Sequence, residues 1–121
     1  MNKNTIKLLH WESDSLKQLR TLLDDVQDVF GFALHLAQTG GKHEQAKPLR
    51  DFGSAGVLEV VDNHQGDTYR AVYTVKFANA VYVLHCFQKK SSNGIATPKP
   101  DMDLIRKRLN DAEQHYKGSK K

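Results

Sequence analysis

The sequence predicts an α+β fold: a small antiparallel sheet, with its helices on one face. Two observations carry this prediction. Residues 69–77 alternate between apolar and polar side chains and residues 80–87 are almost continuously apolar, which is typical of a central β-hairpin. Residues 26–37 and 105–116 repeat apolar side chains at helical spacing. At 121 residues and 39% hydrophobic content, the chain is expected to form one domain over residues 1–121, with a disordered tail from residue 117.

The N-terminal part predicts one strand and two helices. Residues 6–11 form a short apolar run that favours an opening strand. Ser13 is expected to cap a first helix in which leucines recur, and a second helix begins at Asp24 and ends at the glycine pair beginning with Gly40. The polar and basic segment 42–54 then predicts a loop.

The middle of the chain predicts strands and the last part a helix. Residues 57–61 form a short apolar run that favours a strand, and residues 62–67 predict a turn that leads into the hairpin. After the hairpin, residues 91–101 are rich in Gly, Pro and Ser and predict a loop. Asp101 is expected to cap the single C-terminal helix.

The hairpin turn is expected at residues 78–79, because asparagine tolerates the left-handed conformation of a tight turn. The pairs predicted from a two-residue turn are Phe77 with Ala80, Val72 with His85, and Arg70 with Phe87. Alternation then brings Arg70, His85 and Lys89 to the same face at the open end of the hairpin, whereas a bulge would separate them.

The net charge of +4 is unevenly distributed. Up to Gln88 the chain has 9 Lys and Arg against 10 Asp and Glu, and from Lys89 onward it has 9 against 4. A basic excess that begins at the mouth of the hairpin favours an anionic partner, with nucleic acid as the first candidate. A solvated basic tail explains the same excess, so both interpretations stay open.

Cysteine and histidine usage favours a cytoplasmic protein without a metal site. Cys86 has no second cysteine to bind and is expected to be a small buried side chain. The six histidines lack the spacing of a metal site, so no cofactor is expected, and His35 is expected at the surface. Neither a signal peptide nor an apolar run of about 18 residues is visible, so no membrane contact is expected.

Three stretches carry a resemblance to a known toxin superfamily. They read AKPLRDFGSAGVLEVV, GDTYRAVYTVKF and YVLHCFQKKSSNGIATPKPD. In this order and spacing they resemble the phage-derived, HigB-like branch of the RelE/ParE toxin superfamily, and the likeness covers residues 5–116. The resemblance implies a RelE-like fold, in which helices flank a small antiparallel sheet. Many relatives carry ELR where this chain reads Glu59-Val60-Val61, so one basic residue of the pattern is missing.

The resemblance implies the toxin of a type II toxin–antitoxin system. Members of the RelE and HigB branches are endoribonucleases that cut mRNA, usually in the ribosomal A site, whereas ParE members poison DNA gyrase. The expected partners are a cognate helix-turn-helix antitoxin, mRNA and the ribosome, with the toxin monomeric inside a toxin–antitoxin hetero-oligomer. Two alternatives stay open, namely a ParE-like gyrase inhibitor that is no nuclease, and a catalytically inactive module that binds antitoxin or nucleic acid.

The chemistry expected of such a ribonuclease is metal-free attack by the 2′-OH of the RNA, which requires charge stabilisation and proton transfer. The resemblance implies Arg70, Lys89 and Lys90 as site residues, and an exposed Arg70 could hold the phosphate with its planar fork. His85 is the group on this face that titrates near neutrality, with a buried core histidine as an equal alternative. The structural alternatives are pairing of Arg70 with Glu59, and lysines that protect the strand end from aggregation. RNA contacts are expected from Lys76, Lys99, Arg106 and Lys107.

Overall fold

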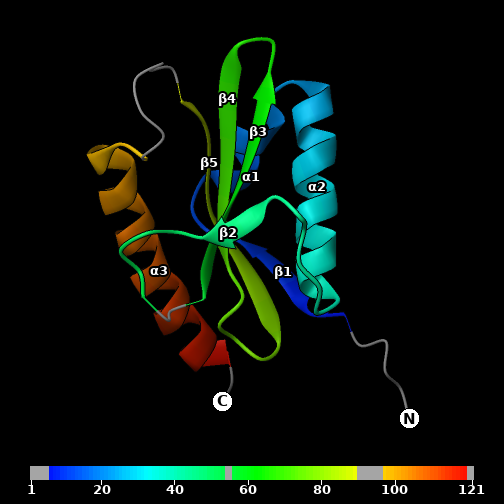
Figure 1. The fold of residues 1–121 in the computed structure, drawn as a ribbon. Helices are drawn as coiled ribbons and strands as arrows, with labels where there is room; N and C mark the ends of the chain where they lie inside the picture. Colours follow the sequence, from blue (N-terminus) through cyan, green and yellow to red (C-terminus); the bar gives the residue numbers. More distant parts are fainter. Residues whose placement is uncertain (1–5, 54–55, 90–96, 120–121) are drawn as a thin grey trace.

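The computed structural model describes residues 6–53, 56–89 and 97–119, which form a five-stranded sheet with helices on both faces (Figure 1). The elements are β1 (Leu8–Trp11), α1 (Ser15–Arg20), α2 (Asp24–Gln38), β2 (Ala46–Pro48), β3 (Val57–His64), β4 (Asp67–Thr74), β5 (Ala80–Lys89) and α3 (Lys99–Ser119). The strand order is β1-β5-β4-β3-β2. The predicted α+β class is confirmed. One detail is wrong, since β1 runs parallel to β5 and only the other neighbours are antiparallel.

The helices cover both faces of the sheet, not one face as the sequence suggested. On one face Val26, Phe30 and Leu34 of α2 pack against inward side chains of the strands. On the other face Ile105 and Leu109 of α3 pack against a second apolar cluster. Figure 1 shows α2 and α3 on opposite sides of the strands. Both faces of β4 and β5 are therefore buried, although the alternation in β4 predicted only one buried face.

The β4–β5 hairpin has the predicted register at its open end and a different turn. Val72 lies opposite His85 and Arg70 lies opposite Phe87, as predicted. The two strands are joined by residues 75–79, so the predicted turn and the pairing of Phe77 with Ala80 are wrong. A bulge in β5 explains both results. Val72 pairs with His85 and Tyr73 pairs with Val83, so Leu84 is an extra residue without a partner in β4. This extra residue offsets the different turn, and the predicted pairs are recovered toward the open end of the hairpin.

Two further corrections concern strands next to the hairpin. The segment predicted as a loop over residues 42–54 contains the edge strand β2, which pairs with β3. β3 continues to His64, so the turn is shorter than residues 62–67. It consists of Gln65 and Gly66, both at positive φ, which is the geometry of a tight hairpin turn. Pairing with a neighbouring strand thus makes β2 and the end of β3 extended, although their polar residues suggested loops and turns from periodicity alone.

The predicted helix caps are also wrong. Ser13 has a φ of 52°, and Asp14 occupies the N-cap position of α1 without a side-chain capping bond. α3 begins at Lys99, so Asp101 lies in its first turn, where its carboxylate faces the positive end of the helix. The helix also continues through Ser119, so residues 117–119 are helical and not part of a disordered tail. The predicted end of α2 before Gly40, which has a φ of 90°, is confirmed.

Candidate functional site

The most polar part of the interior lies on the sheet face that α3 covers, and Arg70 is its centre. Arg70 Nη1 donates a hydrogen bond to Glu59 Oε2 at 2.7 Å, and both side chains are buried. The contact is diagonal, because Glu59 lies opposite Val72 in the neighbouring strand. Arg70 is therefore not the exposed residue that the sequence predicted. It occupies the pairing with Glu59 that was the structural alternative.

Thr97 closes this pair from the segment that precedes α3. Its hydroxyl donates to Glu59 Oε2 at 2.8 Å and accepts from Arg70 Nη1 at 3.3 Å. Arg70 lies opposite Val61, which occupies the place where many relatives of the resembled family carry a basic residue. The β3 side chain that bonds Arg70 is instead the carboxylate of Glu59, two residues before Val61 in the strand.

His85 is held by side chains from two helices. Its Nε2 is 2.8 Å from Asp101 Oδ1 in α3, and its Nδ1 is 3.2 Å from Gln18 Oε1 in α1. The ring also stacks on Phe87 with a centroid separation of 4.4 Å. Burial lowers the pKa of His85 below 6.5, and the hydrogen bond to Asp101 acts in the opposite direction. His85 is therefore a buried histidine, bonded to a carboxylate and not to a backbone carbonyl.

Lys89 completes the predicted cluster, whereas Lys90 lies outside the described residues. Lys89 is buried at the end of β5 opposite Thr68. Because side chains alternate along a strand, Lys89 shares its sheet face with His85 and with Arg70 from β4. The structure thus groups these three side chains in register on one face, but buries each of them.

Arg108 reinforces this region from α3, and its side chain is buried. Its Nη1 donates to the carbonyl of Leu84 at 2.8 Å and its Nη2 donates to Asp14 Oδ1 at 2.7 Å. Leu84 is the extra residue of the β5 bulge, where a strand leaves main-chain groups without their ladder partners. Arg108 satisfies that carbonyl and attaches α3 both to the sheet and to the start of α1.

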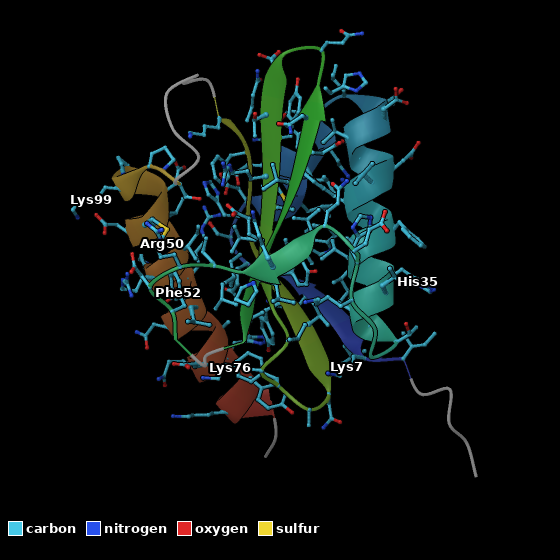
Figure 2. All side chains as sticks on the ribbon, viewed as in Figure 1. Lys7, His35, Arg50, Phe52, Lys76 and Lys99 are labelled. Carbon is cyan, nitrogen blue, oxygen red and sulfur yellow. The ribbon has the colours of Figure 1, made fainter. Side chains whose placement is uncertain are left out.

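The four cations expected to contact RNA lie on or beside α3, and each has a side-chain partner. The ion pairs are Lys76 with Glu113, Lys99 Nζ with Asp103 Oδ2 at 2.9 Å, and Lys107 Nζ with Asp111 Oδ2 at 2.9 Å. Arg106 instead places its guanidinium carbon 4.7 Å from the ring centroid of Phe52. Figure 2 shows Lys99 at the start of α3 and Lys76 near its other end, so the cations extend along the helix.

Three residues of this site were not predicted as site residues from the sequence. Thr97 is 27 residues from Arg70, Asp101 is 16 residues from His85, and Gln18 is 67 residues from it. No local periodicity connects such positions. Thr97 and Asp101 lie in the third stretch that carries the family resemblance, but Asp101 was expected to be a helix cap. Only the packing of α1 and α3 against the sheet brings them to the site.

The family model of phage-derived Gp49-like proteins (DUF891) matches residues 17–110. This chain belongs to that family. Among solved structures, the chain is similar to the E. coli toxin RelE in the free state, solved as a double arginine-to-alanine mutant. The two are 17% identical with a TM-score of 0.57, and the match covers 88% of this chain and 97% of the RelE chain. No curated protein matches the sequence. The likeness to RelE shows a shared fold, and it confirms the predicted RelE-like architecture.

Two absences can be stated for this Gp49-like protein within the described ranges. In residues 6–53, 56–89 and 97–119 no group of three or more His, Cys, Asp or Glu side chains is arranged to hold a metal ion. Over the same ranges no helix has the length and apolar character that crossing a membrane requires. Cys86 is buried as expected, and burial raises the pKa of its thiol to about 12.

Proposed function

We propose that this protein is the toxin of a type II toxin–antitoxin system, of the HigB-like branch, and a metal-free endoribonuclease that cleaves mRNA on the ribosome in the cytoplasm. Its Gp49-like family and its RelE-like fold support this proposal. The observation that carries it is the group formed by Arg70, His85 and Lys89 on the sheet face beneath α3. This group combines two cations of the types that bind phosphate with an imidazole, a side chain suited to proton transfer.

In the proposed reaction, the 2′-OH of the RNA attacks the adjacent phosphorus. The O2′–P bond forms, the P–O5′ bond breaks, and the products are a 2′,3′-cyclic phosphate and a 5′-OH. A base removes the proton of the 2′-OH and an acid protonates the leaving 5′-oxygen. Arg70 stabilises the additional negative charge on the phosphoryl oxygens with two donors of its fork. Lys89 and Lys90 hold the neighbouring phosphates, and His85 transfers the proton.

The substrate has to replace internal contacts to reach these groups. Arg70 is bound by Glu59 and Thr97, and a phosphate that engages Arg70 takes the place of the Thr97 hydroxyl. Asp101 accepts from His85 Nε2, which stabilises a protonated imidazole and orients its ring. Glu59 and Asp101 are thus proposed as positioning residues for the arginine and the histidine.

A second candidate function is favoured by the burial of the same residues. Arg70 and His85 are only 4% and 3% exposed and are hydrogen-bonded to internal partners, as is common for structural side chains. In that case the protein is a ParE-like inhibitor of DNA gyrase, or an inactive module that binds antitoxin or nucleic acid. The missing basic residue at Val61 points in the same direction.

Mapping RNA ends separates the candidates. The purified protein is added to a bacterial translation extract, and the 5′ ends of the mRNA are sequenced with and without the protein. A ribonuclease acting on the ribosome produces cuts in phase with codons, and these cuts disappear when ribosomes are removed. An intact mRNA pool together with gyrase-dependent DNA breaks would instead identify the gyrase inhibitor. Absence of both effects supports the inactive module.

A further inference from the structure

Of the four cations expected to contact RNA, Arg106 lies closest to an aromatic ring, that of Phe52, whereas Lys76 Nζ is 5.7 Å from the ring centroid of Phe77. Phe52 belongs to the chain between β2 and β3, which crosses in front of α3 in Figure 2. The guanidinium of Arg106 lies over its ring at 4.7 Å, and Arg106 itself is exposed. The guanidinium therefore contacts the Phe52 ring while the side chain as a whole remains exposed, so a planar ligand can reach it from solvent.

Arg106 also lines an open groove along the outer surface of α3, with a volume of about 500 Å³. The groove is shallow and open to solvent, so it suits a planar group that rests on the surface rather than an enclosed ligand. The groove is lined by Asp103, Arg106, Lys107, Leu109, Asn110 and Glu113. Its floor includes the apolar Leu109, and its walls offer carboxylate and amide groups that can accept or donate hydrogen bonds to the edge of a base.

The charge of this surface does not suit a phosphate track. Its four cations face three carboxylates, so the formal net charge is only +1. The carboxylates of Asp103 and Glu113 lie in the groove wall itself and repel a phosphate, whereas they can accept from the amino groups of a nucleobase. Stacking on a planar group needs little net charge, because it depends on the aromatic face of the base.

We propose that this groove binds a nucleobase of single-stranded RNA, stacked on Arg106, and that Phe52 holds the guanidinium in the stacking orientation. The inference rests on the proposed RNA-directed function and adds to it a base contact on α3, separate from the phosphate contact at Arg70. Arg106 and Phe52 then act as one unit, in which the aromatic ring restricts an otherwise flexible side chain before the base arrives.

The test is binding of two chemically matched probes. The first is a fluorescein-labelled decamer of 2′-O-methyl adenylate, which cannot be cleaved because its 2′-oxygen carries no proton. The second is a 2′-O-methyl decamer without bases, which has the same backbone charge. Fluorescence anisotropy of the full-length protein gives the Kd of each. We expect tighter binding of the adenylate decamer, and Phe52→Ala and Arg106→Lys to weaken that binding about fivefold or more. Neither change should alter the Kd of the abasic decamer by more than about twofold.

Matched controls carry the same substitutions at other exposed positions. Phe32→Ala changes the 56% exposed phenylalanine of α2, which lies on the opposite side of the strands from α3, and Arg20→Lys changes an exposed arginine of α1. Both should bind the decamers as the wild type does. Phe52→Tyr keeps the ring and should also preserve binding. If Phe52→Ala does not fold, Arg106→Lys carries the test.

The results separate this inference from the proposed function. Equal affinity of the wild type for the two decamers, or unchanged adenylate binding by both Phe52→Ala and Arg106→Lys, would overturn the inference. Cleavage of mRNA is assayed separately in the translation extract. If base-dependent binding is present and cleavage is absent, the inference stands and the proposed ribonuclease function fails. If cleavage is present without any base preference in binding, the ribonuclease function stands and the inference fails.

Discussion

Arg70 and Glu59 form an ion pair inside the protein, with side chains that are only 5% and 6% exposed and a separation of 2.7 Å. The desolvation of two buried charges costs free energy, which the pair and its hydrogen bonds offset. Removing one partner leaves the other charge buried without compensation. The pair therefore links a proposed catalytic residue to the stability of the fold, and the two contributions have to be measured separately.

We expect Arg70→Ala to abolish mRNA cleavage and to lower the free energy of unfolding by about 3–5 kcal/mol, because Glu59 loses its counter-charge. The double variant Arg70→Met with Glu59→Gln removes both charges and should recover most of the lost stability. Urea unfolding measures stability, and RNA end mapping measures cleavage. A double variant that is both stable and fully active would contradict the role of Arg70. Arg70→Lys should also be inactive, since a single ammonium cannot replace the fork.

Acid should destabilise the protein through His85. Burial lowers the pKa of folded His85, while an unfolded histidine titrates near about 6.5. Below pH 6.5 the unfolded state therefore binds more protons, and stability falls as the pH falls toward the folded pKa. The charged groups around the ring that act on it are Asp101, Arg108 and Asp14. Urea unfolding at about pH 7.5 and 5.5 should show a smaller difference for His85→Gln than for the wild type.

Two other histidines calibrate this pH experiment. The pKa of His10 is also lowered, by burial and by His115, with Glu12 acting in the opposite direction. His10→Gln should consequently remove a further part of the pH dependence. His35 is exposed on α2, so His35→Gln should behave as the wild type does. If His85→Gln retains the full pH dependence, the buried imidazole is not its source.

The thiol of Cys86 should be unreactive in the folded protein. It is buried in β5, and burial raises its pKa to about 12, so the nucleophilic thiolate is scarce near neutral pH. We expect the aromatic disulfide reagent DTNB to modify Cys86 at pH 8 only as fast as the protein unfolds. The measurement compares the labelling rate with the unfolding rate over a series of urea concentrations. Rapid labelling in the absence of urea would show that β5 opens locally.

Docking of α3 on the sheet should depend on Ile105, which is fully buried. Ile105→Ala removes apolar atoms and leaves a cavity, and we expect a loss of about 2–5 kcal/mol in the free energy of unfolding. The companion variant Phe30→Ala creates a cavity on the opposite face, beneath α2. Hydrogen exchange of the two variants should show faster opening of α3 for the first and of α2 for the second.

On the proposed toxin function, an antitoxin is expected to cover the basic end of the hairpin. On that model the change of Lys89 and Lys90 to alanine lowers the affinity of the co-purified complex, and high salt dissociates it more readily. The measurement is titration calorimetry at two salt concentrations. Unchanged affinity, together with a loss of affinity in Phe32→Ala on α2, would place the antitoxin on the helices of residues 13–38 and indicate inhibition by bulk.

The sequence was sufficient for features that depend on neighbours along the chain. The apolar stripe of α2, its end before Gly40, and the central position of β5 all follow from local periodicity and glycine placement. The register of Arg70 opposite Phe87 was also predicted, although through a wrong turn. The extra residue Leu84 corrected that error, and no sequence pattern indicated it.

The tertiary structure alone decided how the candidate site is arranged. Strand periodicity shows which residues share a face but not what covers that face, so the burial of Arg70 by Thr97 had no local signal. The bond between His85 and Asp101 forms only because α3 lies across the sheet. The parallel pairing of β1 with β5 requires the chain to cross back over the sheet between the two strands. These features depend on the packing of segments far apart in the chain, where desolvation and hydrogen-bond satisfaction outweigh local propensity.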